Sequence, residues 1–536
     1  MGRRPDYDAR FFEPEPADPA ESGVSRRGFL RGAGTALGAG ALGATAGRTL
    51  DRDMAPIHRR GGGGPDPAFF GRMFPNMQTF AEPTDALREA MRDIGKPGGI
   101  MDAADDLAAG PTLLITDLTL SEVNRNNDAQ TAGVTFYGQF LDHDLTFDAA
   151  SPLGEPVEPS ESRNTRTPII DLDSLYGGGP TVSPMLYDQA DRAKLRIESG
   201  GQFEDVPRTA DGAAIIGDQR NDEHMILSGL HAAFIMFHNN VVDWVREEGG
   251  ITGRQAFSAA RETVVRHHQW ITVHEFLPLI LGQERTDQIF RRRRFYRPSR
   301  AYMPVEFQGA AYRFGHSMVR PSYRANLLGD NGEPFFAFIF DPAGEGQADP
   351  VDLRGGARAP RRFIGWGTFF DFGDGNVRPN KRIDTKLSTP LFDLPLPAIP
   401  SEDPPTALPQ RNLLRHITWS LPSGQAIAQA MGVEQLQAAD LSELSGYSLG
   451  LESNTPLWYY VLKEAELMND GLTLGPVGGT IVGEVFAGVL QTDRGSYLSQ
   501  QGWRPSLPTQ NDTVTGEFTM LDLLHFAGVD PATRGQ

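Results

Sequence analysis

Three short segments of the chain combine residue types that can move protons or hold a metal ion. The first is residues 137–144, YGQFLDHD, and on a helix its Gln139 and His143 lie one turn apart on the same face, with Asp142 beside them. Histidine changes its charge near neutral pH, so an imidazole next to an amide and a carboxylate can serve as an acid–base group. Composition alone also fits a solvated acidic helix face, which is the plain alternative.

Two further segments contain an arginine and a lone histidine. Residues 217–224, GDQRNDEH, open a helix, where the carboxylate of Glu223 complements the helix dipole and Arg220 fits an ordinary surface position. Residues 312–318, YRFGHSM, place His316 among aromatic residues and beside a glycine, which allows a large flat group to approach the backbone. A lone histidine of this kind is more often a core residue than a ligand.

Helices are expected to position these residues. Apolar residues repeat at three- and four-residue steps over 222–246 and over 257–280, where Pro278 is expected to stop the second helix. Shorter segments with the same periodicity are 133–145, 409–431 and 456–468. Strand-like alternation is scarce, so the sequence predicts a mainly α fold.

The sequence shows no internal repeat and no break between domains beyond residue 70. Segments 344–360 and 389–410 are rich in Pro and Gly and are expected to form long surface connections. We therefore expect a single large domain over residues 70–536.

Composition excludes several classes of function. The 536 residues include 50 basic and 69 acidic side chains, a net charge of −19, which argues against general binding to nucleic acid or anionic lipid. The chain has no Cys, so thiolate nucleophiles, thiolate-bound iron and Fe–S clusters are excluded. No run of eighteen apolar residues occurs, and we expect no stable membrane span.

The N-terminal region is expected to be an export signal rather than part of the fold. Arg26-Arg27 precedes a weakly apolar stretch that is too short to span a membrane, and Ala44-Thr45-Ala46 matches the A-x-A pattern of a signal-peptide cleavage site. These features predict a twin-arginine-type signal over 1–46, a flexible linker over 47–69, and a periplasmic or extracellular location. A chance arginine pair in a flexible tail is the alternative.

Together, these segments resemble the peroxidase–cyclooxygenase superfamily, the animal-type haem peroxidases, and especially its bacterial branch. The resemblance runs over about residues 70–525. It rests on motifs that occur in the family's order: GQFLDHD at 138–144, GDQR with Glu223 at 217–223, FGH at 314–316, EFLPLILG at 275–282, RNLLR at 411–415 and LGP at 474–476.

The resemblance implies a role for each matching residue. His143 would be the acid–base group on the distal side of haem b, with Arg220 and Gln139 beside it to stabilise peroxide oxygens. His316 would be the proximal ligand of the haem iron. Asn412 would hydrogen-bond the other ring nitrogen of His316, and Arg415 would lie near a haem propionate.

Two further features follow from the resemblance. Asp142 and Glu223 match the carboxylates that form ester bonds to haem, whereas His224 occupies the position at which some members have a sulfonium-forming Met. The family's calcium site matches hard oxygen ligands, as calcium prefers: the side chains of Asp144, Thr167, Asp171 and Asp173 and the carbonyl of Ile169. An Asp-rich turn without a metal is the alternative for this loop.

The implied activity is reduction of hydrogen peroxide with oxidation of small organic donors, halides or pseudohalides. Two alternatives stay open: a haem-dependent fatty-acid oxygenase of the same superfamily, and a non-catalytic, calcium-stabilised adhesion protein. Oxygenases use a Tyr three residues before the proximal His, a position that Arg313 occupies here. Tyr312, one residue earlier, would point about 100° away on a regular helix. The sequence does not indicate an oligomeric state.

Overall fold

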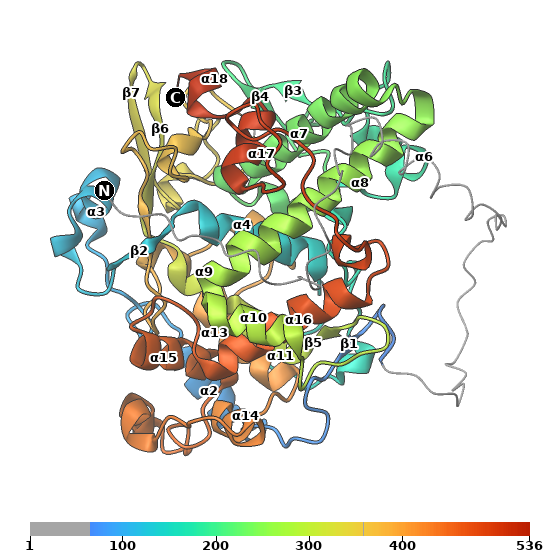
Figure 1. The fold of residues 1–536 in the computed structure, drawn as a ribbon. Coiled ribbons are helices and arrows are strands. Elements are labelled where there is room, and N and C mark those ends of the chain that lie inside the picture. The colour runs from blue at the N-terminus through green and yellow to red at the C-terminus, as the bar shows by residue number, and fades with distance from the viewer. Residues whose placement is uncertain (1–64, 149, 357, 536) are drawn as a thin grey trace, which may run out of the picture.

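The computed structural model describes residues 65–535 apart from residues 149 and 357. The expected export signal and residues 47–64 of the expected linker lie outside the described residues. Helices dominate the molecule (Figure 1), in agreement with the predicted mainly α fold.

In the described part of the chain, six helices of more than ten residues build the core: α4 (Gly133–Leu145), α7 (Met225–Gly249), α8 (Gly253–Ile271), α13 (Leu408–Thr418), α15 (Leu457–Asn469) and α16 (Pro476–Thr492). Shorter helices surround them: α2 (Asp85–Ile94), α3 (Pro111–Thr116), α5 (Asp173–Tyr176), α6 (Gly179–Val182), α9 (Leu277–Leu281), α10 (Gln283–Arg291), α11 (Val305–Gln308), α12 (Gly315–Met318), α14 (Gly424–Met431), α17 (Met520–Phe526) and α18 (Pro531–Arg534).

The strands form two-stranded pairs rather than a large sheet. β1 (Phe70–Gly71) pairs in parallel with β5 (Met303–Pro304). Three pairs are antiparallel: β2 (Asn126–Thr131) with β8 (Pro379–Lys381), β3 (Glu198–Ser199) with β4 (Glu204–Asp205), and β6 (Ser322–Asp330) with β7 (Glu333–Phe338). The scarcity of strands expected from the sequence is confirmed.

The helix over 133–145 is confirmed at both ends, whereas α7 starts three residues later than its periodicity indicates. Residues 219–222 form a 3₁₀ turn, and α7 begins at Met225. His224 caps it, because the Nδ1 atom of His224 accepts a hydrogen bond from the backbone N–H of Leu227 at 3.3 Å. This cap uses an imidazole in place of the more usual hydroxyl or carboxylate.

The prediction that Pro278 stops the second helix is wrong. A π-helical turn over Thr272–Phe276 joins α8 to α9, and Pro278 is the second residue of α9. A proline is tolerated in the first turn of a helical segment, since its missing N–H has no helical partner there. The expected helix over 409–431 is also interrupted, between α13 and α14, where Pro422 lies.

The prediction that 389–410 is a surface connection is wrong in part. Leu391, Leu394 and Ile399 are buried, and the segment lines the central cavity described below. Its apolar residues lack helical periodicity because short 3₁₀ turns and prolines separate them.

One stretch of the described chain, Met225–Glu247, is long and apolar enough to cross a membrane. In the fold, 83% of its apolar window is buried. It packs against α4 and α8 and is therefore the central core helix, which explains its hydrophobicity on nearly every side.

α12 packs against α4, so the two segments that the sequence singled out face each other across the centre of the molecule.

Candidate active site

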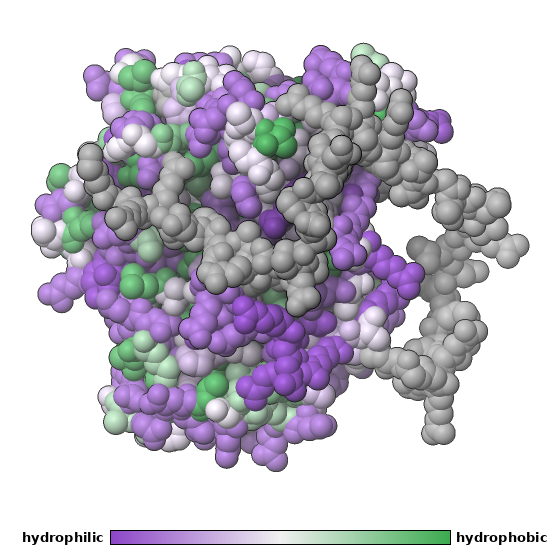
Figure 2. Space-filling model, viewed as in Figure 1, coloured by the Kyte–Doolittle hydropathy of each residue, from purple (hydrophilic) through white to green (hydrophobic). Residues whose placement is uncertain are grey.

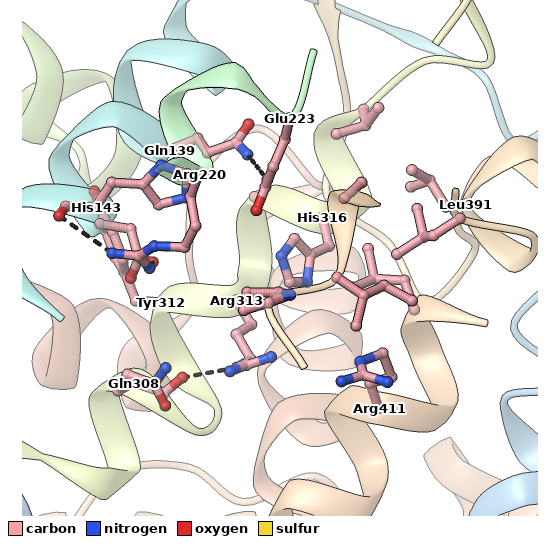
Figure 3. A pocket seen from close by; sticks show the side chains of 18 of the residues that line it. Gln139, His143, Arg220, Glu223, Gln308, Tyr312, Arg313, His316, Leu391 and Arg411 are labelled. Carbon is pink, nitrogen blue, oxygen red and sulfur yellow. Dashed lines mark hydrogen bonds and ion pairs between the residues drawn. The ribbon is translucent and has the colours of Figure 1, made fainter. Parts of the chain in front are cut away.

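A cavity of about 630 Å³ lies between α4 and α12. Ligand pockets are typically of this size. His143 on α4 and His316 on α12 line it from opposite sides (Figure 3). The sequence-predicted Gln139, Asp142, Arg220, Glu223 and Arg415 line the same cavity, so the fold brings together residues that are up to 276 positions apart (415 − 139).

His143 has a fixed tautomer. Its Nδ1 lies 2.9 Å from the Oδ1 of Asn221, and the Nδ2 of Asn221 donates to the Nδ1 of His231 at 3.0 Å. An amide oxygen can only accept, so Nδ1 of His143 carries the proton and Nε2 has a free lone pair. Burial, with Arg220 nearby, lowers the pKa of His143 to about 3. The imidazole is therefore neutral and able to take up a proton.

Arg220 is held rigidly next to His143. Its guanidinium donates to both carboxylate oxygens of Asp218, at 3.0 and 2.7 Å, and to the carbonyls of His143 and Thr146, at 3.2 and 2.7 Å. It also lies over the ring of Phe147, 4.3 Å from the centroid. Arg220, with Arg166 on the other side, holds the pKa of Asp218 below its usual range despite burial, so the pair of Asp218 with Arg220 is ionic.

Two half-buried carboxyl groups, those of Asp142 and Glu223, line the same cavity. Asp142 Oδ2 is 3.7 Å from the guanidinium of Arg220, and burial raises the pKa of Asp142. Burial raises the pKa of Glu223 to about 8, so it is largely protonated at neutral pH. The protonated carboxyl group of Glu223 can be brought against an apolar ligand at much lower cost than a carboxylate.

A chain of hydrogen bonds orients Gln139. His224 accepts from the backbone at Nδ1, so its Nε2 carries the proton and donates to the Oε1 of Gln139 at 2.9 Å. The Nε2 of Gln139 then donates to the Oε2 of Glu223 at 3.1 Å. An amide nitrogen has two hydrogens, so Gln139 keeps one donor for a ligand in the cavity.

On the opposite wall, His316 contacts Asn412 as the sequence predicts. The Nδ2 of Asn412 lies 2.7 Å from the Nδ1 of His316, and the Oδ1 of Asn412 accepts from the Nη1 of Arg313 at 2.6 Å. Arginine can only donate, so Arg313 fixes the amide with its nitrogen toward His316. Burial lowers the pKa of His316 to about 3, which keeps the ring neutral.

Arg415 lies at the rim, where its Nη1 donates to the Oδ2 of Asp148 at 2.7 Å and to the carbonyl of Ser151 at 3.2 Å. Its buried Nε has no partner among the described residues. Arg411 also lines the cavity beside the apolar segment that contains Leu391 (Figure 3). The two arginines bring guanidinium groups to this end of the cavity, where Asp148 balances the charge of Arg415.

Tyr312 lines the cavity, contrary to the expectation that it points away. It lies in a 3₁₀ turn over Ala311–Phe314 rather than in a regular α-helix, which changes the direction of its side chain. Its hydroxyl donates to the carbonyl of Gly138 at 3.1 Å, and its ring stacks on Phe307 with centroids 4.6 Å apart.

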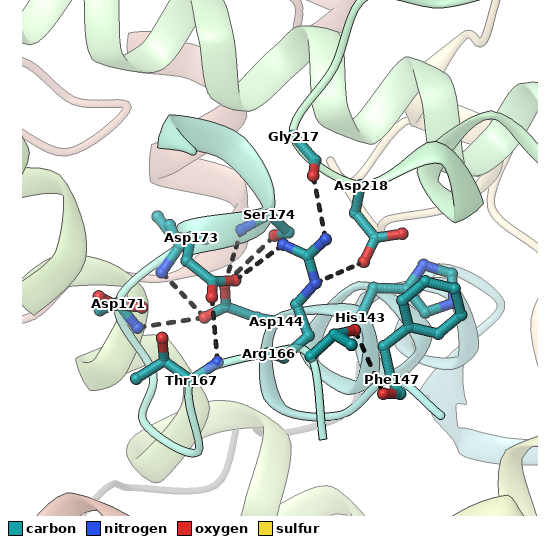
Figure 4. Close-up of polar contacts among 12 residues, drawn as sticks. His143, Asp144, Phe147, Arg166, Thr167, Asp171, Asp173, Ser174, Gly217 and Asp218 are labelled. Carbon is teal, nitrogen blue, oxygen red and sulfur yellow. Dashed lines mark hydrogen bonds and ion pairs between the residues drawn. The ribbon is translucent and has the colours of Figure 1, made fainter. Parts of the chain in front are cut away.

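Behind the cavity, three carboxylates converge at the end of α4. Ligand oxygens of Asp144, Asp171 and Asp173 all lie within 4.8 Å of one another (Figure 4). Asp144 accepts from the backbone N–H groups of Asp171, Leu172 and Ser174 at 3.1, 2.9 and 3.3 Å. Asp144, which directly follows His143, thus links α4 to the loop 167–174.

The other two predicted calcium ligands lie in this loop. Thr167 donates its backbone N–H to the Oδ2 of Asp173 at 3.1 Å, and Ile169 follows two residues later. Arg166 and Arg261 form ion pairs with Asp173 and Asp171, at 3.3 and 3.0 Å. These arginines partly neutralise the cluster.

Three residues with a clear part in this arrangement had no role assigned from the sequence: Asn221, His231 and Arg313. Asn221 could have been considered, since it directly follows Arg220. His231 lies seven residues after His224 on α7, and nothing in its spacing connects it with His143.

Comparisons with known proteins match part of the chain to a family and give its fold. Residues 149–335 match the family model for animal haem peroxidase. The human "Probable oxidoreductase PXDNL" is 29% identical over 227 residues, which is 38% of this chain and 15% of the human protein. The chain thus corresponds to a minor part of that relative.

Solved structures show the same fold. Peroxidase A from Dictyostelium discoideum superposes with a TM-score of 0.54 at 15% identity, over 85% of this chain and 95% of that one. The fatty acid alpha-dioxygenase of Oryza sativa gives a TM-score of 0.51 at 14% identity, over 78% of this chain and 76% of that one. Residues 149–335 thus match the animal haem peroxidase family, and the chain has the fold of a single, mainly helical haem peroxidase domain.

Proposed function

We propose that this chain is a haem peroxidase that reduces hydrogen peroxide and oxidises small organic donors, halides or pseudohalides. One observation carries the proposal. Two neutral imidazoles, those of His143 and His316, face one cavity from opposite walls, and the Nε2 of neither has a partner among the described residues. The shared cavity distinguishes this pair, because the core residue His268 also has an unpaired Nε2 but does not line the cavity.

The residues around the cavity fit haem b. His316 would hold the iron through Nε2, and Arg415 and Arg411 provide cations for the propionates. Ligation requires the proton of His316 to be on Nδ1, so the amide of Asn412 must turn and present its oxygen. Arg313 then loses its acceptor and becomes available to an anionic group. Bound haem supplies an iron that binds peroxide and accepts and releases electrons.

The distal residues would handle the protons. His143 Nε2 takes a proton from one oxygen of hydrogen peroxide and delivers it to the other, which leaves as water. Asn221 and His231 keep Nδ1 protonated throughout, so the lone pair always faces the peroxide. Over a full cycle, two electrons and two protons from donors reduce one hydrogen peroxide to two waters.

Arg220 would stabilise the charge that develops on the leaving oxygen. Its guanidinium is a permanent cation already fixed by Asp218, so little reorganisation is needed when the O–O bond breaks. Gln139 would add a neutral donor through its second amide hydrogen. Arg220 is charged and Gln139 is neutral, so replacing Arg220 is expected to slow the reaction with peroxide more than replacing Gln139.

Asp142 and Glu223 would form ester bonds with the haem. Both carboxyl groups line the cavity, and burial raises the pKa of each. His224 is engaged with Gln139 and offers no sulfur, so a sulfonium bond at this position is not expected. We also propose calcium at Asp144, Asp171 and Asp173, with Thr167 and Ile169 completing the shell.

The remaining proposals concern the chain as a whole. Residues 1–46 would direct export by the twin-arginine route, with 47–69 as a linker and 70–536 as the catalytic domain of a bacterial-branch member. The convergence of His143, Arg220 and His316 on one cavity speaks against a purely adhesive protein, which has no need of such a set.

The test is a panel of peroxide-dependent assays on haem-loaded protein, with phenols, iodide, bromide, chloride and linoleate. Oxidation of phenols or iodide that requires both peroxide and haem supports the proposal. Absence of turnover with every donor, in protein with a normal Soret band, would contradict it.

A fatty-acid oxygenase is the second candidate, because the phenol of Tyr312 lines the cavity next to α4. A phenol at this place can lose a hydrogen atom and then abstract one from a fatty acid. Oxygen uptake with linoleate that is lost in Tyr312→Phe, while iodide oxidation is retained, would favour the oxygenase. Tyr323→Phe is a suitable control, since Tyr323 is equally buried but does not line the cavity.

A further inference from the structure

A second feature of the molecule lies outside the cavity and is independent of the proposed peroxidase function. Six of the ten residues over 291–300 are arginines, in a chain with 50 basic and 69 acidic side chains. They occupy the end of α10 and the loop that leads to β5. We call residues 291–300 the arginine loop.

Most of these charges are uncompensated. Among the described residues, only Arg291 of the arginine loop has a carboxylate within 4.0 Å, that of Asp287 at 3.8 Å. The carboxylate nearest to the loop backbone, Glu484, accepts the backbone N–H groups of Arg294, Phe295 and Tyr296 at 2.6, 2.6 and 2.8 Å. Its oxygens are thus used by the backbone and not by the guanidinium groups.

These bonds hold the loop backbone in place, and the side chains of Arg293 and Arg297 add hydrogen bonds to the carbonyls of Tyr296 and Arg293, at 2.7 and 2.6 Å. Glu484 is 1% exposed and lies on the core helix α16, so the three N–H bonds tie the loop backbone to the core. Arg291, Arg292 and Arg297 are exposed. Arg297 uses its Nε for the carbonyl of Arg293 and keeps both Nη groups for a ligand, and the loop backbone needs no ordering when that ligand binds.

The exposed guanidinium groups surround a depression in the surface. Arg291, Arg292, Arg293 and Arg297, together with Gln491, line a surface cavity of about 430 Å³. The Nε of Arg293 donates to the Oε1 of Gln491 at 2.9 Å, and this hydrogen bond fixes the guanidinium group of Arg293. Figure 2 shows strongly hydrophilic side chains gathered over α10 and the following loop.

A structural role explains only part of the cluster. Cations are favourable at the C-terminal end of a helix, which accounts for Arg291 and Arg292 at the end of α10. Arg297 lies beyond the helix, and like charges this close repel one another. Asp287 and Glu484 are the carboxylates described at the loop, too few to balance six arginines, which indicates that a further anion comes from outside.

We propose that the arginine loop binds a soluble anion with several phosphate groups in a row. The planar guanidinium fork matches the oxygens of a tetrahedral phosphate in a bidentate manner. Several arginines around one depression can bind successive phosphate groups of one ligand at the same time. A single orthophosphate cannot contact all of them. A concave site on the protein favours a ligand that enters it over a flat lipid surface.

Binding of inorganic tripolyphosphate to the full chain, followed by isothermal titration calorimetry at 0.1 M salt, tests the proposal. The triple variant Arg291→Gln, Arg292→Gln, Arg297→Gln is expected to bind about a hundredfold more weakly, because three charge-assisted contacts are lost. Arg163→Gln, Arg192→Gln, Arg254→Gln is the matched control, with the same change in net charge at exposed positions elsewhere. This control should bind like the wild type.

The single variant Arg292→Gln guards against a folding defect, since no ion pair or hydrogen bond of this side chain is lost among the described residues. It should unfold at the wild-type temperature and bind tripolyphosphate about tenfold more weakly. Equal binding by the loop triple variant and the control would overturn the proposal. So would binding to phosphatidylglycerol vesicles without binding to tripolyphosphate, since the partner would then be a membrane.

Discussion

The amide nitrogen of Asn412 lies 2.7 Å from the Nδ1 of His316, with its orientation fixed by Arg313 on the other side. With this orientation, the proton of the neutral imidazole is on Nε2, the atom that faces the cavity. Under the proposed function, haem ligation by His316 would require a turn of one amide and the release of one arginine. The three residues form a unit rather than a simple ligand with a partner.

The first prediction concerns this unit. Asn412→Asp should retain haem, because a carboxylate accepts from Nδ1–H without any turn, and it should lower the midpoint potential of the iron by making His316 more basic. Asn412→Leu should weaken haem binding about 10- to 100-fold, the usual cost of losing such a partner. Spectroelectrochemistry and haem titration measure both effects, with the exposed Asn240→Asp as control. An unchanged potential in Asn412→Asp would show that the contact has no influence on the ligand.

The second prediction is that the haem becomes ester-linked. After turnover with peroxide, haem mass should be found on peptides that contain Asp142 or Glu223, and extraction with acidified acetone should leave part of the haem on the protein. Asp142→Asn, Glu223→Gln should release all of it. Complete extraction from active wild-type enzyme would contradict the prediction.

The site residues could be predicted because each lies in a short motif that matches a family pattern. The helix over 133–145 could also be predicted, since Gln139 and His143 share a face only if the segment is helical. The contacts that hold these residues in place could not be predicted. Asn221 reaches His143 only because a 3₁₀ turn at 219–222 replaces the expected first turn of the helix.

The third prediction concerns calcium at the end of α4. Calcium should raise the unfolding temperature of the wild type, with a gain of about 4 kcal/mol at a thousandfold excess over its Kd. Asp171→Asn, Asp173→Asn should abolish the gain, since a cluster with one carboxylate left binds calcium poorly. Differential scanning fluorimetry with calcium and with EDTA measures it. Asp188→Asn, Asp191→Asn is a control with the same charge change, and a calcium response lost in both variants would argue against the site.

The fourth prediction is a loss of stability in acid. Burial lowers the pKa of His238 and His267 to about 4, from an ordinary value of 6.5. Between pH 6.5 and 4 the unfolded chain takes up protons that the folded chain does not, so the free energy of unfolding decreases as the pH falls through this window. By pH 5 each residue has lowered the free energy of unfolding by about 2 kcal/mol relative to its value at high pH, and by about 3.4 kcal/mol once the pH is below 4.

Denaturant unfolding of the apoprotein at pH 7 and pH 5 measures this slope. His238→Gln should be less stable at pH 7 and should lose less stability between the two pH values than the wild type. An identical loss in the variant and the wild type would show that His238 takes up its proton in the folded state.

Two errors in the expected fold have a common cause. Pro278 and the apolar residues of 389–410 were interpreted from local signals, but tertiary packing decides both. A π-helical turn accommodates the proline, and burial against the cavity holds the irregular segment. Neither feature has a periodicity that a single sequence reveals. The direction of the Tyr312 side chain could not be predicted for the same reason, because it depends on a 3₁₀ turn.

Haem titration of the apoprotein tests the central claim most directly. Wild-type protein and His143→Ala should each bind one haem and give a Soret band, whereas His316→Ala should not retain haem on gel filtration. His143→Ala should then react with peroxide about 10²- to 10⁴-fold more slowly than the wild type, the usual cost of losing a general acid–base group. Stable haem binding by His316→Ala, with loss of haem in His143→Ala, would contradict the assignment of the two walls of the cavity.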